Sequence, residues 1–254
     1  MKSDYLLIDV GNGRTKFAQS SREALLGRRE TGTRELSAES LRDVLGDWTF
    51  DRVVACSVVP AATQVLREFF GPTLVELKHD GRLGIGVSYP NPQSIGPDRL
   101  ANAVALSALY AKPGAPGIVI DFGTAVTFDV LSEEHAYIGG VIAPGLRLMT
   151  DYLHERTALL PLVTLRPPDS AIGKSTEDAI LAGAAVGYRG MVRGILEAIR
   201  RELPHGDQAA IVATGGDSEW IVEGLGEVQV VDPDLTLHGL RLVGNLAALP
   251  VPLT

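Results

Sequence analysis

The sequence predicts an α/β protein built from two similar lobes that face a shared cleft. Apolar runs with strand character alternate with helical segments through both halves of the 254-residue chain, and this alternation is typical of α/β folds. One pattern also occurs twice: residues 6–18 and 117–129 each contain an apolar run, Asp-x-Gly, a polar turn and a second apolar run. The aligned pairs lie 112 residues apart, close to half of the chain, and are Asp9 with Asp121, Gly11 with Gly123 and Thr15 with Thr127.

The repeated Asp-x-Gly turn has the composition of a ligand-binding loop. Glycine lets the backbone turn tightly and brings N–H groups close to a ligand, where they can bind an anion. An aspartate at this place would repel a phosphate directly, so we expect it to hold a cation or a water of that cation. Asp and Gly are also common in ordinary turns, but two matched copies half a chain apart favour the binding loop.

The composition is that of a soluble globular protein, with 45% apolar and 21% charged residues. A net charge of -8 argues against non-specific binding to nucleic acid or to an anionic membrane. Cys56 is the only cysteine, which excludes an intrachain disulfide and fits a reducing cytoplasm. No apolar run reaches the ~18 residues that span a bilayer, and the N-terminus lacks the pattern of a signal peptide. We therefore expect a cytoplasmic protein with no nucleic-acid or membrane partner.

Several elements follow the first hairpin. Residues 20–36 are charged and irregular, which predicts either a second hairpin or an exposed loop. Ser37 is a candidate N-cap for a short helix. Residues 52–59 predict a buried strand, in which Cys56 is most simply a small core residue, and Pro60 begins the next helix.

A strand at 73–77 leads into a Gly- and Pro-rich loop over 79–97, and a long Ala-rich helix follows at 100–111. Pro97 fits the first position of this helix, and Asp98 falls in its first turn, where the helix dipole favours an anion. Asp98 is therefore either a residue that satisfies the dipole, paired with the next residue, or a functional carboxylate presented beside a flexible loop.

The Pro- and Gly-rich residues 112–117 predict a linker, which divides the chain into an N-terminal lobe over 1–114 and a C-terminal lobe over 115–254. In the second lobe, residues 176–202 predict a helix whose glycines allow close packing with another helix, and its charged residues argue against a membrane span. The other elements expected here are a strand from Tyr137, a helix around Leu148, strands at 209–213 and 228–231, and helices from Glu219 and Leu235.

Two familiar motifs are excluded. Gly173-Lys174-Ser175-Thr176 resembles the end of a Walker A motif, but Pro168 stands where the leading glycine belongs, so we reject a P-loop. The five histidines lack the spacing of metal ligands, which makes a zinc site improbable.

With these residues assembled, the chain resembles the type III pantothenate kinases of the acetate kinase/actin/hexokinase-like superfamily, from residue 6 to about 245. Each motif alone is weak, but six of them occur in the family's order. They are Asp9-Val10-Gly11-Asn12; Tyr89 with Gly96-Pro97-Asp98-Arg99 and Asn102; Asp121 to Asp129; Gly139 to Gly145; Gly173 to Thr176; and Thr214-Gly215-Gly216-Asp217.

The resemblance implies two ribonuclease H-like or actin-like lobes, each a mixed sheet flanked by helices, with a cleft between them. It also implies an ATP-dependent kinase that phosphorylates pantothenate to 4'-phosphopantothenate, the first step of coenzyme A biosynthesis. The cofactors expected on this basis are ATP, Mg²⁺ and a monovalent cation, potassium or ammonium. The expected assembly is a homodimer, with which the glycine-faced helix over 176–202 is compatible.

The resemblance also implies roles for individual residues. Asp98 would accept the proton of the primary hydroxyl of pantothenate, Asp121 would bind the monovalent cation, and Thr124 would contact phosphate. The ATP phosphates would be wrapped by Asp9, which would also lie near Mg²⁺, and by Val10, Gly11, Asn12, Gly13, Arg14, Thr15 and Lys16. Pantothenate would be held by Tyr89, Gly96, Pro97, Asp98, Arg99 and Thr176.

One position departs from the family pattern. Gly13 stands where the family usually has Thr, so the nearest hydroxyl is that of Thr15. The lost hydroxyl would weaken phosphate binding unless Arg14 or Thr15 compensates. Two alternatives therefore stay open: a catalytically weak nucleotide-binding regulator on the same fold, and a kinase for another small alcohol.

Overall fold

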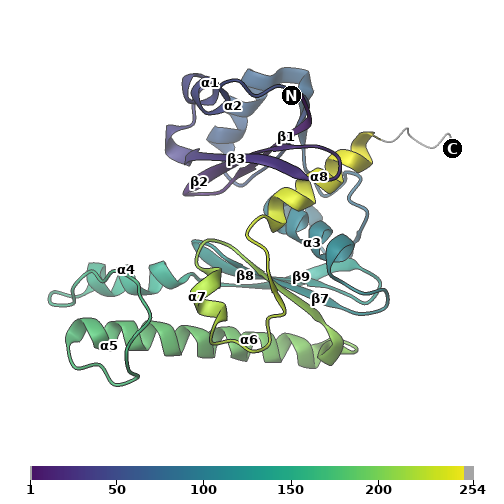
Figure 1. Ribbon diagram of the computed structural model, residues 1–254. Coiled ribbons are helices and arrows are strands. Elements are labelled where there is room, and N and C mark those ends of the chain that lie inside the picture. The colour runs from purple at the N-terminus through teal and green to yellow at the C-terminus, as the bar shows by residue number, and fades with distance from the viewer. Residues whose placement is uncertain (1, 249–254) are drawn as a thin grey trace. The chain divides into compact units, whose positions relative to one another are not determined.

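The computed structural model describes residues 2–248, which form two compact units (Figure 1). Among these residues, unit 1 comprises 2–109, 136–138 and 234–248, and unit 2 comprises 110–135 and 139–233. The chain therefore crosses between the units more than once, whereas the sequence predicted one division at residues 114 and 115. That domain boundary stays a prediction.

Unit 1 is built on a five-stranded mixed sheet with the strand order β3-β2-β1-β4-β5. Strand β1 pairs antiparallel with β2 and parallel with β4, so it lies at the centre. The charged segment at 20–36 supplies the edge strand β3, which identifies the second hairpin as the correct alternative. The bounds are β1 (Ser3–Val10), β2 (Arg14–Ser20), β3 (Leu25–Gly32), β4 (Phe50–Ser57) and β5 (Leu74–Glu76).

Helices cover both faces of this sheet. Helices α1 (Ala38–Leu45) and α2 (Pro60–Phe70) pack on one face, and α3 (Pro97–Leu109) and α8 (Leu235–Ala248) on the other. The predicted start signals are confirmed: Ser37 forms a capping box with Ser40, and Pro60 is the first residue of α2. Short 3₁₀ turns connect these elements at η1 (Thr33–Glu35), η2 (Gly71–Thr73) and η3 (Pro92–Ser94).

The alternation of side chains along β1 sorts its residues between the two faces. Leu6, Ile8 and Val10 belong to the core cluster that includes residues of α1 and α2. Tyr5 points to the other face, where it lies close to α8, and Asp9 shares that face because it is four residues further on. The carboxylate at the end of β1 therefore lies on the side of the sheet that carries α3 and α8.

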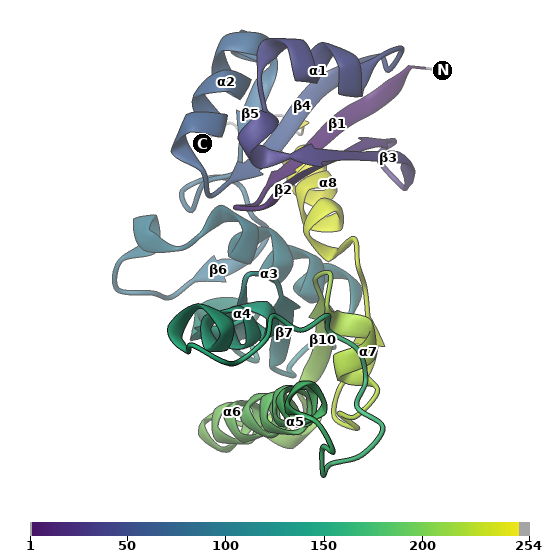
Figure 2. The ribbon, with the colours of Figure 1, turned by 90° about the vertical axis from the view of Figure 1, so that its left-hand side faces the viewer.

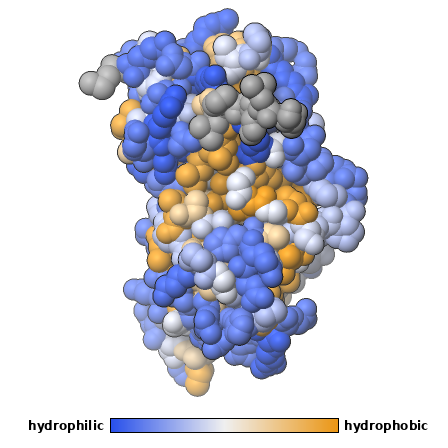
Figure 3. Space-filling view, turned by 90° about the vertical axis from the view of Figure 1, so that its right-hand side faces the viewer, coloured by the Kyte–Doolittle hydropathy of each residue, from blue (hydrophilic) through white to orange (hydrophobic). Residues whose placement is uncertain are grey.

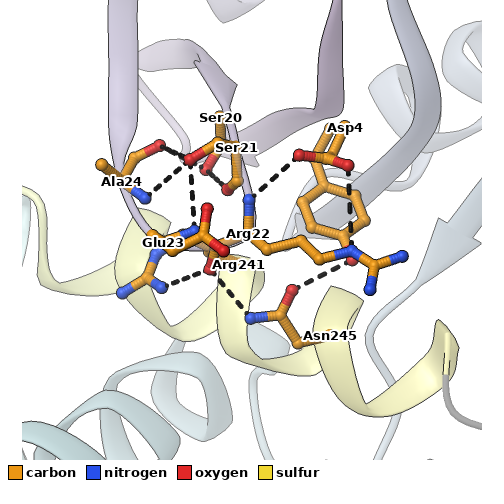
Figure 4. A network of polar contacts seen from close by, with 9 residues as sticks. Asp4, Ser20, Ser21, Arg22, Glu23, Ala24, Arg241 and Asn245 are labelled. Atoms are coloured by element: carbon orange, nitrogen blue, oxygen red, sulfur yellow. Dashed lines mark hydrogen bonds and ion pairs between the residues drawn. The ribbon is translucent and has the colours of Figure 1, made fainter.

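Helix α8 is held in unit 1 by a polar network at the far end of β1 (Figure 4). The Tyr5 hydroxyl donates to Asn245 Oδ1 at 3.0 Å, and the Arg22 carbonyl accepts from Arg241 at 2.8 Å and from Asn245 at 3.0 Å. Thr236 also donates to Asn102 of α3 at 2.8 Å. These bonds explain why the last helix, which the sequence placed in the C-terminal lobe, packs with the first half of the chain.

Unit 2 repeats the architecture of unit 1. Its strands belong to a six-stranded sheet of order β11-β10-β7-β8-β9-β6, and the five strands from β9 to β11 follow the order of unit 1. The central strand again pairs antiparallel with the next strand in sequence and parallel with a later one. The two-lobe prediction is thus confirmed at the level of topology. The bounds are β7 (Gly117–Phe122), β8 (Ala125–Leu131), β9 (Ala136–Pro144), β10 (Ala210–Thr214) and β11 (Val230–Val231), and β6 (Gly86–Val87) pairs with the first residues of β9.

A long helical run follows one face of the second sheet (Figures 1 and 2). It consists of α5 (Thr176–Ala182), a π-helical turn (Gly183–Gly187) and α6 (Tyr188–Glu202). Among the described residues it is the one helix long and apolar enough to cross a membrane, by length and composition alone. Its inward side chains, including Tyr188 and Val192, belong to the core of unit 2, and we therefore interpret it as a core helix. The remaining elements are α4 (Leu146–Arg156), η5 (Gly206–Gln208) and α7 (Ser218–Val222).

Most residues on the face shown in Figure 3 are hydrophilic (blue), and hydrophobic residues (orange) form several patches between them. This distribution agrees with the charged content of 21%. The large apolar side chains of β1, β4, β7 and β8 are instead buried in the two units.

The contact between α3 and α8 predicts a stability effect at Gly239. A Cβ at this position would lie 2.0 Å from the Ala101 carbonyl oxygen, so Gly239→Ala would force the two helices apart. We expect a loss of about 1–3 kcal/mol in the free energy of unfolding, measured by urea denaturation. Gly226→Ala is the control, because a Cβ there meets no atom within 4 Å; equal stability of the two variants would contradict the packing argument.

Candidate active site

The first Asp-x-Gly loop lies at the carboxyl ends of β1 and β4. Asp9 is directly opposite Lys16 of β2 and Cys56 of β4, so these three side chains form a row on the face of the sheet that carries α3. The row combines an amine, a carboxylate and a thiol. Within unit 1 it brings two of the predicted phosphate-loop residues, Asp9 and Lys16, onto one face.

Thr33 stabilises this loop through two hydrogen bonds. The Thr33 hydroxyl donates to the Gly11 carbonyl at 2.7 Å, and the Thr33 N–H donates to the Gly13 carbonyl at 3.2 Å. Two carbonyl oxygens that would repel a phosphate are thereby engaged inside the protein. Thr33 lies in the charged segment that gave no functional signal in the sequence, so this supporting residue could not be identified there.

Thr15 does not occupy the position that the sequence alignment gave it. It lies opposite Val10, whereas Thr127 lies opposite Asp121, because the first loop is one residue longer than the second. Thr15 therefore points to the other face of the sheet from Asp9; it is fully buried, and its hydroxyl is 3.0 Å from that of Thr33. The pairing of Thr15 with Thr127 was wrong, since one register step moves a side chain to the opposite face.

The departure at Gly13 lies in an open part of the loop. A Cβ at Gly13 would meet no atom within 4 Å, and the backbone there does not adopt a positive φ. The neighbouring Arg14 makes an exposed ion pair with Glu30 at 3.0 Å. Asn12 is also exposed. The geometry of this loop therefore does not require glycine at position 13.

Cys56 contacts Asp9 of this loop, and its thiol is also influenced by Asp98. Its thiol lies 3.4 Å from Asp9 Oδ1 in a buried position. Burial first, and then the negative charges of Asp9 and Asp98, raise the pKa of the Cys56 thiol. Both carboxylates therefore act electrostatically on the same buried thiol within unit 1. The sequence identified Cys56 as a core residue, and its contact with Asp9 follows only from the pairing of β1 with β4.

Asp98 is held at the N-terminus of α3. Its Oδ1 accepts from the Arg99 N–H at 2.9 Å, which satisfies one of the amides that a helix start leaves unpaired. Burial raises the pKa of the Asp98 carboxyl, and the bond from Arg99 and the charge of Arg99 oppose that effect in part. The carboxylate lies directly over Gly96, where an added Cβ would come within 2.5 Å of Oδ1. The Gly-Pro-Asp-Arg motif thus builds a helix start around one desolvated carboxylate.

Tyr89 and Arg99 meet a common partner, Tyr137. The Tyr89 ring packs edge-on against that of Tyr137, with centroids 6.1 Å apart. The Arg99 guanidinium carbon lies 5.8 Å from the Tyr137 ring centroid. Tyr137 belongs to unit 1 although it opens a strand of the second sheet. The sequence gave no role to this residue.

The second Asp-x-Gly loop has the equivalent place in unit 2. Asp121 lies opposite Thr127 of β8 and Thr214 of β10, so the row that corresponds to Lys16, Asp9 and Cys56 carries oxygen atoms alone. Ile120 and Phe122 face the core cluster, and the alternation turns Asp121 to the other face. Thr124 is exposed at the tip of the loop.

Two glycines from later motifs pack against this second loop. The Gly145 N–H donates to the Thr124 carbonyl at 3.1 Å, and a Cβ on Gly145 would lie 2.3 Å from that oxygen. Gly215 has a φ of 95°, and its Cβ would lie 2.5 Å from the Phe122 carbonyl oxygen. Three motifs that are far apart in sequence therefore meet within unit 2, where close backbone contact leaves no room for a side chain.

Thr176 is the first residue of α5, behind the N-cap Ser175, whose hydroxyl accepts from the Asp178 N–H at 3.0 Å. It is exposed and belongs to unit 2, whereas Tyr89 and the segment from Gly96 to Arg99 belong to unit 1. Within residues 2–248, no group of three or more His, Cys, Asp or Glu side chains could hold a metal ion.

The fold and the paired loops define the class of protein. Two sheets that share the order of five strands, each with an Asp-x-Gly turn after its central strand, form an actin-like fold. Solved structures agree on the fold. A putative Baf family transcriptional activator from Campylobacter jejuni gives a TM-score of 0.62 at 18% identity, covering 94% of this chain and 96% of that one. Component A of the (R)-2-hydroxyglutaryl-CoA dehydratase of Acidaminococcus fermentans gives 0.52 at 15%, covering 96% of each chain.

Sequence relatives identify the family. The sequence model of type III pantothenate kinase matches residues 5–198. The type III pantothenate kinase of Akkermansia muciniphila is 50% identical over 243 residues, which cover 95% of this chain and 98% of that protein. The one from Methylacidiphilum infernorum is 43% identical, covering 95% and 88%. This chain belongs to the type III pantothenate kinase family.

The position of Asp98 over Gly96 gives a test of the site geometry. We expect Gly96→Ala to leave the fold intact, because the atom it displaces is the end of a side chain, but to move the Asp98 carboxylate from its place. Activity should then fall by at least about tenfold, since small displacements of a reacting group are costly. Circular dichroism and thermal unfolding report on the fold, and turnover reports on the site. Wild-type turnover in this variant would show that the carboxylate position does not matter.

Proposed function

We propose that the protein transfers the γ-phosphoryl group of ATP to the primary hydroxyl of pantothenate. The product is 4'-phosphopantothenate, and the reaction is the first step of coenzyme A biosynthesis. The observation that carries this proposal is the desolvated Asp98 carboxylate at the start of α3, in the same unit as Asp9, Tyr89 and Arg99. Membership of the type III pantothenate kinase family supports the choice of substrates.

In this mechanism Asp98 is the general base. Phosphoryl transfer has a loose transition state, so the protein acts mainly by positioning the groups and stabilising charge. A carboxyl whose pKa is raised by burial is a stronger base than an exposed one, and Asp98 meets this condition. Tyr89, Arg99 and Thr176 hold the pantothenate, with the backbone of Gly96 and Pro97 beside its hydroxyl.

The two Asp-x-Gly loops bind the phosphates of one ATP molecule. Residues 10–16 surround the phosphates, and Lys16 supplies a positive charge from the same face as Asp9. Asp9 would hold Mg²⁺, which would supply positive charge against the phosphates, and Thr124 would contact phosphate from the second loop. Asp121 binds a monovalent cation, potassium or ammonium. Its neighbours Thr127 and Thr214 give that row the oxygen-only character that suits a hard cation.

A coupled assay of ADP release, with purified protein, ATP and pantothenate in the presence and absence of potassium, tests the function. Release that depends on both pantothenate and potassium would support the proposal. Other small alcohols in the same assay separate the substrate class from the reaction. ADP release with another alcohol but not with pantothenate would overturn the substrate assignment.

A second candidate is a nucleotide-binding regulator that catalyses weakly. The observation that favours it is the first loop, where Gly13 lacks a hydroxyl and the Thr15 hydroxyl is engaged with Thr33 inside the protein. Arg14 is the remaining group that could compensate, and it is exposed. Binding of ATP without pantothenate-dependent ADP release would favour this candidate over the kinase.

We also propose that the protein is a homodimer. Unit 2 exposes large apolar side chains on α4 and on the long helical run, namely Leu148 (47%), Tyr152 (57%), Leu153 (41%) and Val186 (56%). The Cβ positions of Gly183, Gly187, Gly190 and Gly194 are open, so a second helix could approach closely. We expect a mass of twice 27.0 kDa by light scattering; a monomer at micromolar concentration would contradict this. We further propose a cytoplasmic protein without nucleic-acid or membrane partners: the single cysteine fits a reducing compartment, and the net charge of -8 argues against binding to anionic partners.

The role of Asp98 predicts both a mutational and a pH effect. Asp98→Asn keeps an oxygen for the Arg99 N–H and removes a buried charge, so we expect normal folding and ATP binding. Turnover should fall by about 10²–10⁴-fold. Because the folded protein raises the pKa of Asp98, the base is active above that pKa and is lost as the pH falls through it. On the acid side, the pH at which the wild-type rate falls to half should therefore lie above the ordinary pKa of an aspartate. A half-maximal pH at that ordinary value would contradict the assignment.

A further inference from the structure

Tyr137 is the second residue of β9, and its side chain is fully buried, with 0% exposure. It belongs to the short stretch Ala136–Ile138 that packs in unit 1. Large buried aromatic side chains commonly serve the core, but the surroundings of this ring are unusual. The ring packs against Tyr89 and lies near the guanidinium of Arg99, and both of these residues belong to the predicted pantothenate-binding segment.

At the start of that segment, Tyr137 contacts the residues before Tyr89 through its backbone and Tyr89 itself through its ring. The two-residue strand β6 is paired so that Val87 lies opposite Tyr137. The Ser88 N–H donates to the Tyr137 carbonyl at 2.9 Å. The next residue is Tyr89, which is 36% exposed and packs at 70° against the Tyr137 ring. The direction of the Tyr89 side chain is therefore set by the ring beneath it.

At the other end of the segment, the same ring lies 5.8 Å from the Arg99 guanidinium carbon. A cation over an aromatic face is attracted by the ring, and a long arginine side chain has many rotamers to lose. Arg99 is the third residue of α3 and directly follows Asp98. A single buried ring thus contacts both ends of a segment whose middle is loop and one 3₁₀ turn.

From this arrangement we propose that Tyr137 is a positioning residue for the alcohol substrate: its ring fixes Tyr89 and Arg99 before the substrate binds. This inference rests on the proposed function, because it assigns Tyr89 and Arg99 to pantothenate. Fixing flexible side chains in advance lowers the entropy cost of binding. Removal of the ring therefore weakens the binding of pantothenate and leaves ATP binding unchanged.

The test compares Tyr137→Leu with Tyr137→Phe in steady-state kinetics. We expect Tyr137→Leu to raise the KM for pantothenate by about tenfold, from the loss of two ring contacts, while the KM for ATP changes by less than about twofold. Tyr137→Phe keeps the ring and should keep the pantothenate KM. Equal effects of both substitutions would assign the effect to the hydroxyl and overturn the proposal, as would equal changes in the two KM values.

A purely structural role is separated by two further variants. Tyr137→Met replaces the ring by a flexible apolar side chain that can adapt to the space, and it serves where Tyr137→Leu does not fold. Phe50→Leu removes a ring that packs on Phe70, elsewhere in unit 1, and should lower stability without moving either KM. A pantothenate-specific KM increase in Phe50→Leu would overturn the proposal, since loss of stability alone would then explain the shift.

The wild-type protein separates this inference from the function on which it rests. If wild type does not phosphorylate pantothenate, the proposed function fails. If wild type is active and the Leu and Met variants keep its pantothenate KM, the function stands and the role of Tyr137 fails. A double-mutant cycle with Tyr89→Leu completes the test: coupled effects on the pantothenate KM support the proposal, and additive effects contradict it.

Discussion

The antiparallel ladder between β1 and β2 determines which groups can act beside Asp9. Each step along a strand turns the side chain to the opposite face of the sheet, so the register places Lys16 beside Asp9 and sends Thr15 into the interior. The parallel pairing with β4 completes the row with Cys56. The helix that presents Asp98 packs on this same face. A slip of one residue would replace the row by the apolar side chains that now form the core.

The second unit uses the same ladder with a loop that is one residue shorter. Asp121 has the place of Asp9, but its neighbours are Thr127 and Thr214 in place of Lys16 and Cys56. Two copies of one scaffold therefore offer different chemistry at equivalent points. One row carries positive charge and a thiol beside the carboxylate, and the other carries oxygen atoms alone. This asymmetry supports the proposal that the first loop binds phosphate and Mg²⁺ and that Asp121 of the second loop binds a monovalent cation.

The sequence predicted the features that depend on local chemistry. Both hairpins, the Ser37 cap, the Pro60 start and the position of Asp98 in the first turn of α3 follow from neighbouring residues, and the structure confirms them. It could not predict features that depend on pairing between distant segments. The packing of α8 in unit 1 and the ring of Tyr137 beneath Tyr89 arise from contacts over dozens of residues. Thr15 and Thr127 have the same spacing from Asp9 and Asp121 in the sequence, but they are not equivalent in the structure. The loop of the first hairpin is one residue longer, and the sequence does not reveal this difference.

Glycine in place of the family's threonine at position 13 removes a hydroxyl that could bind phosphate, but it leaves the geometry of the loop unchanged. The loop is shaped by Thr33, which engages the carbonyls of Gly11 and Gly13, and by the bond from the Gly11 N–H to the Arg14 carbonyl at 3.0 Å. None of these bonds involves a side chain at position 13, where the space is open. The backbone amides of the loop are therefore presented as they would be with threonine. We expect the missing hydroxyl to lower the affinity for ATP by the loss of one hydrogen bond to a charged group, about 1.5–3 kcal/mol, while the position of Asp98 stays the same.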